Sequence, residues 1–182
     1  SVFRDIRRTF QALSKNALAE LRSIDLLLNL SPEQVREPER LFDLLEILAS
    51  DALANVKFAF EITETAMLRS ETPVAALRAS GYPLVVDDFG TGFSSLNRFR
   101  EIEVDGLKID MSFVQNSDRE LEGSIVRNIS DLGKRLGVPV IGEGVETEAQ
   151  AEFLREVAGC TTCQGYFYAR PEPFEEFRRR VE

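Results

Sequence analysis

Short apolar runs that each end in a polar residue recur along this chain, and they constrain its fold more than any other feature. Segments with the spacing of helices, such as residues 121–136 and 146–157, separate these runs. A strand, a polar residue, a loop and a helix, repeated in this order, are typical of a parallel α/β protein. The six expected strands lie near residues 24–29, 56–62, 84–87, 105–109, 138–142 and 164–168.

Six strands with helices between them fit part of a β/α barrel. A complete barrel has eight strands and about 250 residues, whereas this chain has 182 residues. We therefore expect an α/β domain with a (β/α)8-type barrel that is incomplete, with about six of its eight strands present. The two uncovered sheet edges of such a domain would favour self-association.

The connecting segments carry helix signals. Residues 31–48 begin with Ser-Pro-Glu-Gln, which suits the first turn of a helix. Pro73 suits the first turn of a helix that runs through Leu77 and ends before Gly81. Residues 173–181 predict a short final helix.

The composition excludes several classes of partner and site. With 31 acidic and 22 basic residues, the formal charge is −9, which argues against binding to DNA or RNA polymers. No apolar run is long enough to cross a membrane, so we expect a cytoplasmic protein or the cytoplasmic part of a membrane-anchored one. Cys160 and Cys163 lack the further ligands of a zinc site, since the chain has no histidine and no other cysteine. We expect both to be reduced thiols.

Asp87 and Asp88 end the apolar run that begins at Leu84. Two adjacent carboxylates at the end of a buried strand repel each other unless a cation lies between them. At the carboxyl edge of a parallel sheet, where barrel active sites form, the pair predicts a divalent metal site.

Polar residues follow other strands as well. Asn29, Glu61 and Glu143 each end an apolar run, and Lys108 lies within another. One such residue alone is more often a helix cap or a surface group than a ligand. Several carboxylates that converge on one edge would be unstable without cations, so the whole set favours a metal centre over a structural role.

Six ordered motifs resemble those of the EAL family, bacterial phosphodiesterases that open the second messenger cyclic di-GMP to linear pGpG. The resemblance extends from about residue 24 to 173 and implies a modified TIM barrel. The motifs are Asn29-Leu-Ser31, Glu61-Ile-Thr-Glu64, Asp87-Asp-Phe-Gly-Thr-Gly-Phe-Ser-Ser-Leu96, Leu107-Lys-Ile-Asp110, Glu143-Gly-Val-Glu-Thr147 and Gln164-Gly-Tyr166.

The resemblance implies a two-metal site for Mg²⁺ or Mn²⁺. Asn29, Glu61 and Asp87 would bind one ion. Asp87, Asp88 and Glu143 would bind the second. Two such cations clamp a phosphodiester and activate the attacking water.

The resemblance also implies catalytic and supporting residues. Lys108 would orient the attacking water, and Glu143 would act as general base, as ligand or as both. Binding of substrate or support of the ligands would fall to Gln164, Glu64, Glu146 and Asp110, with Glu64 anchoring the loop after Asp88. The implied partners are cyclic di-GMP, a second copy of the chain in a homodimer, and an upstream regulatory or GGDEF-type domain in a longer parent protein.

The sequence departs from the family pattern at its start. The Glu-Ala-Leu motif, which supplies a further metal-ligand glutamate, does not precede Asn29. The segment Ala17-Leu-Ala-Glu-Leu21 does not replace it, because it lies in a predicted helix. We interpret residues 1–182 as a single EAL-type domain that is N-terminally truncated. Three functions stay open: a phosphodiesterase within a larger protein, a catalytically inactive cyclic di-GMP receptor or protein-interaction module, and a structural module without a nucleotide.

Overall fold

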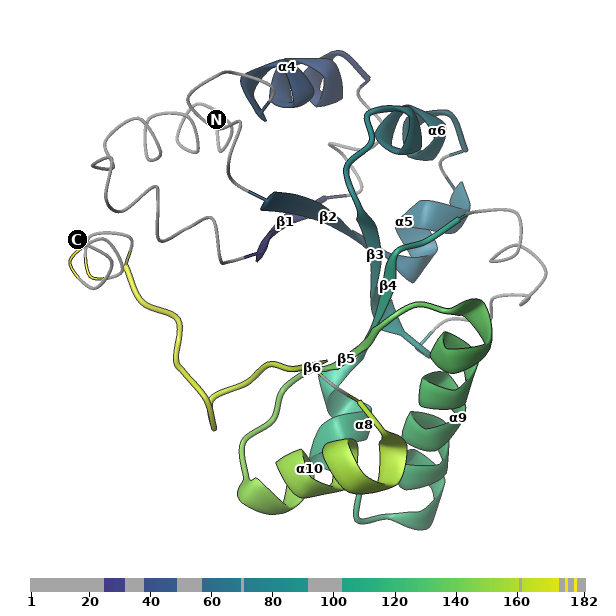
Figure 1. The fold of residues 1–182 in the computed structure, drawn as a ribbon, viewed down its shortest axis with the longest axis vertical. Coiled ribbons are helices and arrows are strands. Elements are labelled where there is room, and N and C mark those ends of the chain that lie inside the picture. Colours follow the sequence, from purple (N-terminus) through teal and green to yellow (C-terminus); the bar gives the residue numbers. More distant parts are fainter. Residues whose placement is uncertain are drawn as a thin grey trace.

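The six strands form one parallel sheet in which each strand pairs with its neighbours in chain order. The computed structural model describes residues 25–31, 38–48, 57–69, 71–91, 103–160, 162–173, 176 and 179. Among these residues, β1 and β6 each pair on one side only, and the sheet curves as an open arc (Figure 1). The strands are β1 Asp25–Leu30, β2 Lys57–Thr63, β3 Leu84–Phe89, β4 Gly106–Ile109, β5 Val140–Gly142 and β6 Thr162–Cys163.

Helices follow β1, β2, β4 and β5 and lie on the outer side of the arc (Figure 1). Between β3 and β4, residues 92–102 are outside the described residues. This arrangement is that of an incomplete β/α barrel, so the predicted fold class is confirmed. The helices are α4 Pro38–Leu48, α5 Glu64–Arg69, α6 Glu71–Ala79, α8 Met111–Gln115, α9 Glu120–Leu136 and α10 Glu148–Glu152, which continues as the π-helical turn η2 Phe153–Ala158.

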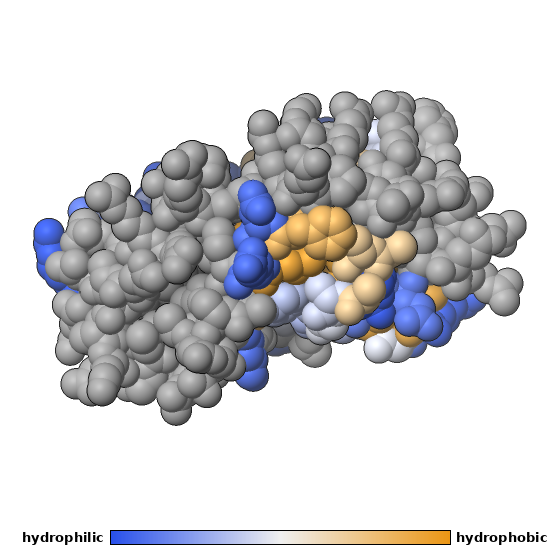
Figure 2. Space-filling view, turned by 90° about the horizontal axis from the view of Figure 1, so that it is seen from above, coloured by the Kyte–Doolittle hydropathy of each residue, from blue (hydrophilic) through white to orange (hydrophobic). Residues whose placement is uncertain are grey.

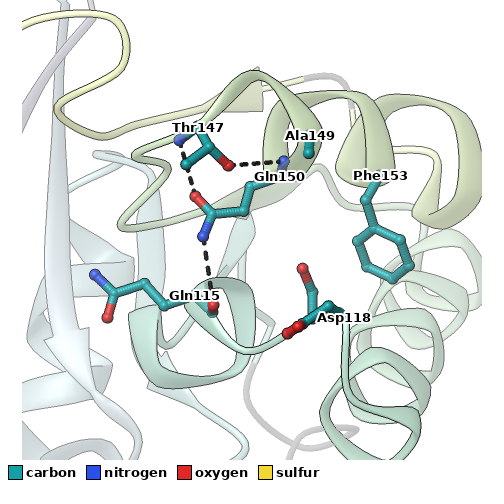
Figure 3. Close-up of a pocket in the computed structure, with 7 residues that line it drawn as sticks. Gln115, Asp118, Thr147, Ala149, Gln150 and Phe153 are labelled. Carbon is teal, nitrogen blue, oxygen red and sulfur yellow. Dashed lines mark hydrogen bonds between the residues drawn. The ribbon is translucent and has the colours of Figure 1, made fainter.

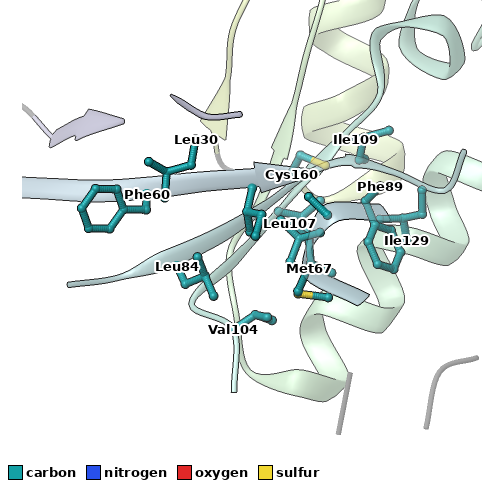
Figure 4. Close-up of a cluster of buried hydrophobic side chains, with 14 of the residues drawn as sticks. Leu30, Phe60, Met67, Leu84, Phe89, Val104, Leu107, Ile109, Ile129 and Cys160 are labelled. Atoms are coloured by element: carbon teal, nitrogen blue, oxygen red, sulfur yellow. The ribbon is translucent and has the colours of Figure 1, made fainter. Parts of the chain in front are cut away.

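The hydrophobic core lies between the sheet and these helices. Successive residues of a strand point to opposite faces of a sheet. Phe60, Leu84 and Leu107 are fully buried and belong to the same cluster as Met67 of α5 and Ile129 of α9 (Figure 4). The alternate residues, among them Glu61 and Lys108, therefore occupy the opposite face, on the inside of the arc.

Helix ends are set by local signals in the sequence. The Asp110 side chain accepts a hydrogen bond from the Ser112 amide and caps α8. Gly137 follows α9 with φ 73°, a left-handed conformation that costs glycine little. Thr147 and Gln150 form a capping box at the start of α10, in which each side chain bonds the backbone amide of the other residue.

Five of the six predicted strands are confirmed to within one or two residues at each end. The strand expected at residues 164–168 is wrong: β6 covers Thr162–Cys163, and the chain then turns through residues 165–168. The tail helix expected at residues 173–181 lies mostly outside the described residues. Both cysteines are free, as expected, and Cys160 is buried beside Ser130.

The surface of the described residues mixes hydrophobic and hydrophilic side chains. Figure 2, which looks from the side on which α4 lies in Figure 1, shows the two kinds next to each other. The α4 residue Phe42 is 58% exposed. Within the described residues, no helix has both the length and the apolar character that a membrane span requires.

Candidate active site

A bulge in β3 brings Asp87 and Asp88 to the same side of the sheet. Val86 pairs with Leu107 and Phe89 pairs with Ile109, so two aspartates of β3 lie opposite the single residue Lys108 of β4. Asp88 takes φ 53°, a conformation that aspartate tolerates better than most side chains. In a regular strand the two carboxylates would point to opposite faces, and the bulge is what lets both face the inside of the arc.

Lys108 lies at the centre of the carboxylates that the sequence predicted. Its Nζ atom lies 2.9 Å from Glu61 Oε1, 3.1 Å from Asp87 Oδ1 and 2.5 Å from Glu143 Oε1. These residues come from β2, β3, β4 and the loop after β5, which are neighbours in the sheet. The side chains of Lys108 and Glu61 are each only 4% exposed, so this charge cluster is largely removed from water.

One lysine does not balance the charge of this cluster. Glu61, Asp87, Asp88 and Glu143 carry four formal negative charges against one positive charge on Lys108, which leaves three. Carboxylate oxygens of Asp87, Asp88 and Glu143 all lie within 4.8 Å of one another. Asp87 Oδ1 is buried and accepts no directed hydrogen bond, although Lys108 Nζ is within ion-pair distance. An acceptor without a hydrogen bond among close carboxylates fits a divalent cation, which prefers oxygen ligands.

The pKa values of the cluster reflect this excess of negative charge. Burial raises the pKa of Glu143; Lys108 lowers it, the charges of Asp87 and Glu61 raise it, and the net change is upward. Burial alone would lower the pKa of Lys108, but its bonds to Glu143 and Glu61 outweigh burial and hold the pKa above its usual value. The lysine therefore keeps its charge.

Asp110 lies next to the cluster and acts on two neighbours. It caps α8, where it accepts hydrogen bonds from the backbone and hydroxyl of Ser112. Its charge also acts on Asp88, whose pKa is raised first by burial and then by the charges of Asp87 and Asp110. Asp110 thus adds to the negative charge around the bulge in β3.

Glu64, the first residue of α5, supports the backbone just after the bulge. Its side chain is buried, and Oε2 accepts a hydrogen bond of 3.2 Å from the Gly90 amide. Gly90 has φ 100° and begins the segment that follows the aspartates. Residues 92–102 lie outside the described residues, so the expected anchoring of the whole loop is seen only at its first residue.

Three of the predicted site residues are exposed rather than buried with the Lys108 cluster. Asn29 pairs in register with Glu61 and is its neighbour in the sheet, with an exposed side chain. Gln164 is exposed, and its backbone joins the ends of β5 and β6. Glu146 accepts a hydrogen bond of 2.9 Å from Gln115 of α8.

The family of the chain follows from a direct comparison. The family model described as EAL domain matches residues 4–171. The chain belongs to the EAL family. The residues of its carboxylate cluster, Glu61, Asp87, Asp88 and Glu143, come from the motifs that the sequence analysis singled out.

Relatives and solved structures agree with this assignment. The chain is 39% identical to a protein of Escherichia coli named probable cyclic di-GMP phosphodiesterase PdeI, over 82% of this chain and 19% of that protein. The structure of the phosphodiesterase PaMucR of Pseudomonas aeruginosa with cyclic di-GMP superposes with TM-score 0.79 at 29% identity, over 97% of this chain and 74% of that one. Klebsiella pneumoniae BlrP1 with manganese and cyclic di-GMP gives TM-score 0.74 at 27% identity, over 93% and 44% of the two chains. The EAL chain spans about a fifth of the length of PdeI.

Sequence reasoning missed two features of this EAL site. The bulge was not predicted, although aspartate, the residue at position 88, tolerates left-handed backbone better than most residues. The side chains of Gln115 and Gln150, which bond to the loop after Glu143, were not singled out either. Thr147 and Gln150 have the spacing of a capping box, and this spacing could have identified the second of them.

Proposed function

We propose that this chain hydrolyses cyclic di-GMP to linear pGpG with the help of Mg²⁺ or Mn²⁺. The observation that carries the proposal is the gathering of Glu61, Asp87 and Glu143 around Lys108 at the carboxyl edge of the sheet. The named activity of PdeI and the ligands of PaMucR and BlrP1 support the substrate and the need for a divalent metal.

The proposed metal ligands fit a site with two cations. Glu61 and Asp87, joined by Asn29, would hold one ion. Asp88 and Glu143, with Asp87 between the two sites, would hold the other, and their oxygens are close enough to share a cation. When bound, divalent cations stabilise the charge of a phosphodiester undergoing attack and make water more acidic.

The side chains of this chain would then supply positioning and proton transfer. The Lys108 ammonium would orient the attacking water and offset the negative charge that develops on the phosphorus oxygens. Glu143 would accept the proton of that water as general base, in addition to its role as ligand. Gln164 would contact the substrate, and Glu64, Asp110 and Glu146 would hold the ligands in place.

The wider setting belongs to the same proposal. A single EAL-type domain over residues 1–182 that lacks an N-terminal portion, a homodimer, an upstream regulatory or GGDEF-type domain, and a cytoplasmic location stay predictions. Of the loop that follows Asp88 and ends at Leu96, residues 92–96 lie outside the described residues.

A second function, binding of cyclic di-GMP without hydrolysis, has its own support. The Asn29 side chain is exposed rather than buried with the carboxylates around Lys108. A site in which one ligand is not held in place would bind the nucleotide but position its cations poorly.

The deciding experiment measures hydrolysis and binding in the intact protein. With Mn²⁺ or Mg²⁺ we expect the protein to convert cyclic di-GMP to pGpG, as measured by liquid chromatography. The variant Asp87→Asn should lose this turnover. Asp131→Asn removes an exposed carboxylate of α9 and serves as the control with unchanged turnover. Binding measured by calorimetry without turnover would favour the receptor function, and neither binding nor turnover in folded protein would refute both.

A further inference from the structure

The loop that carries Glu143 is fixed on one side by backbone hydrogen bonds to the turn after β6. This loop, residues 143–147, joins β5 to α10. The Val145 amide donates to the Gln164 carbonyl at 3.0 Å, and the Val145 carbonyl accepts from the Phe167 amide at 2.9 Å. These bonds continue the pairing of β5 and β6 beyond the strands, so this side of the loop needs no side chain to hold it.

The other side of the loop, toward β4, is held differently. The last backbone bond is a long one, 3.3 Å from the Glu143 amide to the Ile109 carbonyl. Beyond it, side chains make the connection to α8 (Figure 3). Gln150 Nε2 donates to the Gln115 carbonyl at 3.3 Å, and Gln115 Nε2 donates to Glu146 Oε1 at 2.9 Å.

Gln150 is bonded at both ends of its amide. Its Oε1 atom accepts from the amides of Glu146 and Thr147, at 2.8 and 3.0 Å. Its Nε2 atom reaches a residue 35 positions earlier in the chain. A capping box needs only the acceptor. The donor end is therefore a second connection, from the Glu143 loop to the helix that begins directly after Lys108 and Asp110.

The surroundings make this connection depend on hydrogen bonds. A cavity of about 320 Å³ lies against Gln115 and Gln150, between α8, the turn before α9, and α10 with η2, and is also lined by Asp118 and Phe153 (Figure 3). A side chain beside a cavity lacks packing partners on that side. The loop also packs against α8 at Gly144, where a Cβ atom would lie 2.4 Å from Met111 Cβ, but that contact limits only a closer approach. On the cavity side, hydrogen bonds of Gln115 and Gln150 are what keep the loop and α8 from moving apart.

We propose that Gln150 is a positioning residue that sets the separation between Glu143 and Lys108. Its acceptor fixes the loop after Glu143, and its donor fixes that loop to the helix after Lys108. The proposal rests on the proposed function, because it assigns Gln150 an effect on the cations that Glu143 would help to hold.

The test compares two variants of the intact protein. Gln150→Glu keeps acceptor oxygens for the amides of Glu146 and Thr147 but removes the donor to Gln115. Thr147→Ala removes the hydroxyl that caps the Gln150 amide, at 3.3 Å, and leaves the Gln150 side chain in place. The first variant breaks the connection and keeps most of the cap, whereas the second weakens the cap and keeps the connection.

Mn²⁺ affinity, measured by calorimetry, is the readout that a purely structural role would not move. We expect Gln150→Glu to weaken Mn²⁺ binding and lower kcat about tenfold, the lower range for removal of a group that orients a ligand. KM for cyclic di-GMP should change less than kcat. The added negative charge alone would tighten cation binding, so weaker binding cannot come from charge. Thr147→Ala should lower the melting temperature with Mn²⁺ affinity and kcat unchanged.

The outcomes separate this inference from the proposed function. Unchanged Mn²⁺ affinity in Gln150→Glu, or equal losses in both variants, would overturn the positioning role. An unmodified protein that binds Mn²⁺ but does not hydrolyse cyclic di-GMP would refute hydrolysis alone, and the Mn²⁺ comparison would still decide the role of Gln150. An unmodified protein that binds no Mn²⁺ would overturn both.

Discussion

The ammonium of Lys108 and the carboxylate of Glu61 lie 2.9 Å apart, and each side chain is only 4% exposed. A buried ion pair gains little over apolar packing, but loss of one partner leaves an uncompensated charge. Here the lysine also forms ion pairs with Asp87 and Glu143. The stability of the cluster without metal therefore depends on one positive charge.

Replacement of that lysine should make folding depend on metal. In Lys108→Met, one buried carboxylate and two partly buried ones lose their cation, and we expect a loss of about 3–5 kcal/mol in the free energy of unfolding without metal. Added Mn²⁺ should restore much of it, and hydrolysis should stay impaired. Urea unfolding with and without Mn²⁺ measures both effects. Lys134→Met, which removes an exposed lysine paired with Asp131, is the control; an equal loss in both variants would contradict the central role of Lys108.

Stability without metal should fall as pH rises above the ordinary glutamate pKa of 4.5. The pKa of Glu143 is raised by burial, so the folded state binds this proton more tightly than the unfolded state. Its contribution is then fully present below the unfolded pKa and is lost as pH rises through the folded one. Asp88, whose pKa is also raised by burial, changes stability in the same direction.

Urea unfolding at several pH values above 4.5 measures how steeply the free energy of unfolding falls with pH. Saturating Mn²⁺ should make this fall smaller, because a cation stabilises the ionised carboxylates. Glu143→Gln should also reduce it, since the variant has no proton to lose at this position. Stability that rises with pH in the metal-free protein would show that other groups dominate.

The sequence predicted correctly where the first five strands lie, but it placed the last strand wrongly. Glu61 and Glu143 end apolar runs, and the edge where parallel strands end is determined by topology. Tyr166, Phe167 and Tyr168 are aromatic and favour strands, yet each is about half exposed in a turn. The strand propensity of these residues is overridden by tertiary contacts, because the chain turns at Gly165 and its backbone bonds to Val145.

The bulge illustrates the other limit of the sequence. Adjacent aspartates predict charge at one edge, but the faces to which they point depend on the register with β4. Val86 and Phe89 both belong to the buried core, with two residues between them instead of one. The extra residue is visible only when the partners Leu107 and Ile109 are known.

The left-handed backbone of Asp88 allows its charge and its conformation to be tested separately. Asparagine tolerates φ near 53°, so Asp88→Asn should fold normally and bind Mn²⁺ more weakly. Valine is β-branched, and Asp88→Val should in addition lose about 1–2 kcal/mol of stability. Thermal unfolding and calorimetry with Mn²⁺ measure the two effects. Equal stability of the two variants would argue against backbone strain at this position.

Gly165 should be the glycine that least tolerates a side chain near the site. A Cβ atom there would lie 2.2 Å from the Val145 carbonyl oxygen and 2.3 Å from its amide nitrogen. Backbone cannot rotate away as a flexible side chain can, so Gly165→Ala must displace the loop that carries Glu143. We expect a loss of about 1–3 kcal/mol, as for overpacking in a core, together with weaker Mn²⁺ binding.

Gly81→Ala provides the matched control for this substitution. Gly81 also has positive φ, 78°, but a Cβ atom there would meet nothing within 4 Å. Its replacement should cost about 1 kcal/mol from backbone conformation alone and leave Mn²⁺ affinity unchanged. Thermal unfolding and Mn²⁺ calorimetry on both variants separate backbone strain from displacement of the loop. If Gly165→Ala weakened Mn²⁺ binding no more than Gly81→Ala did, the contact between Gly165 and Val145 would have no part in placing Glu143.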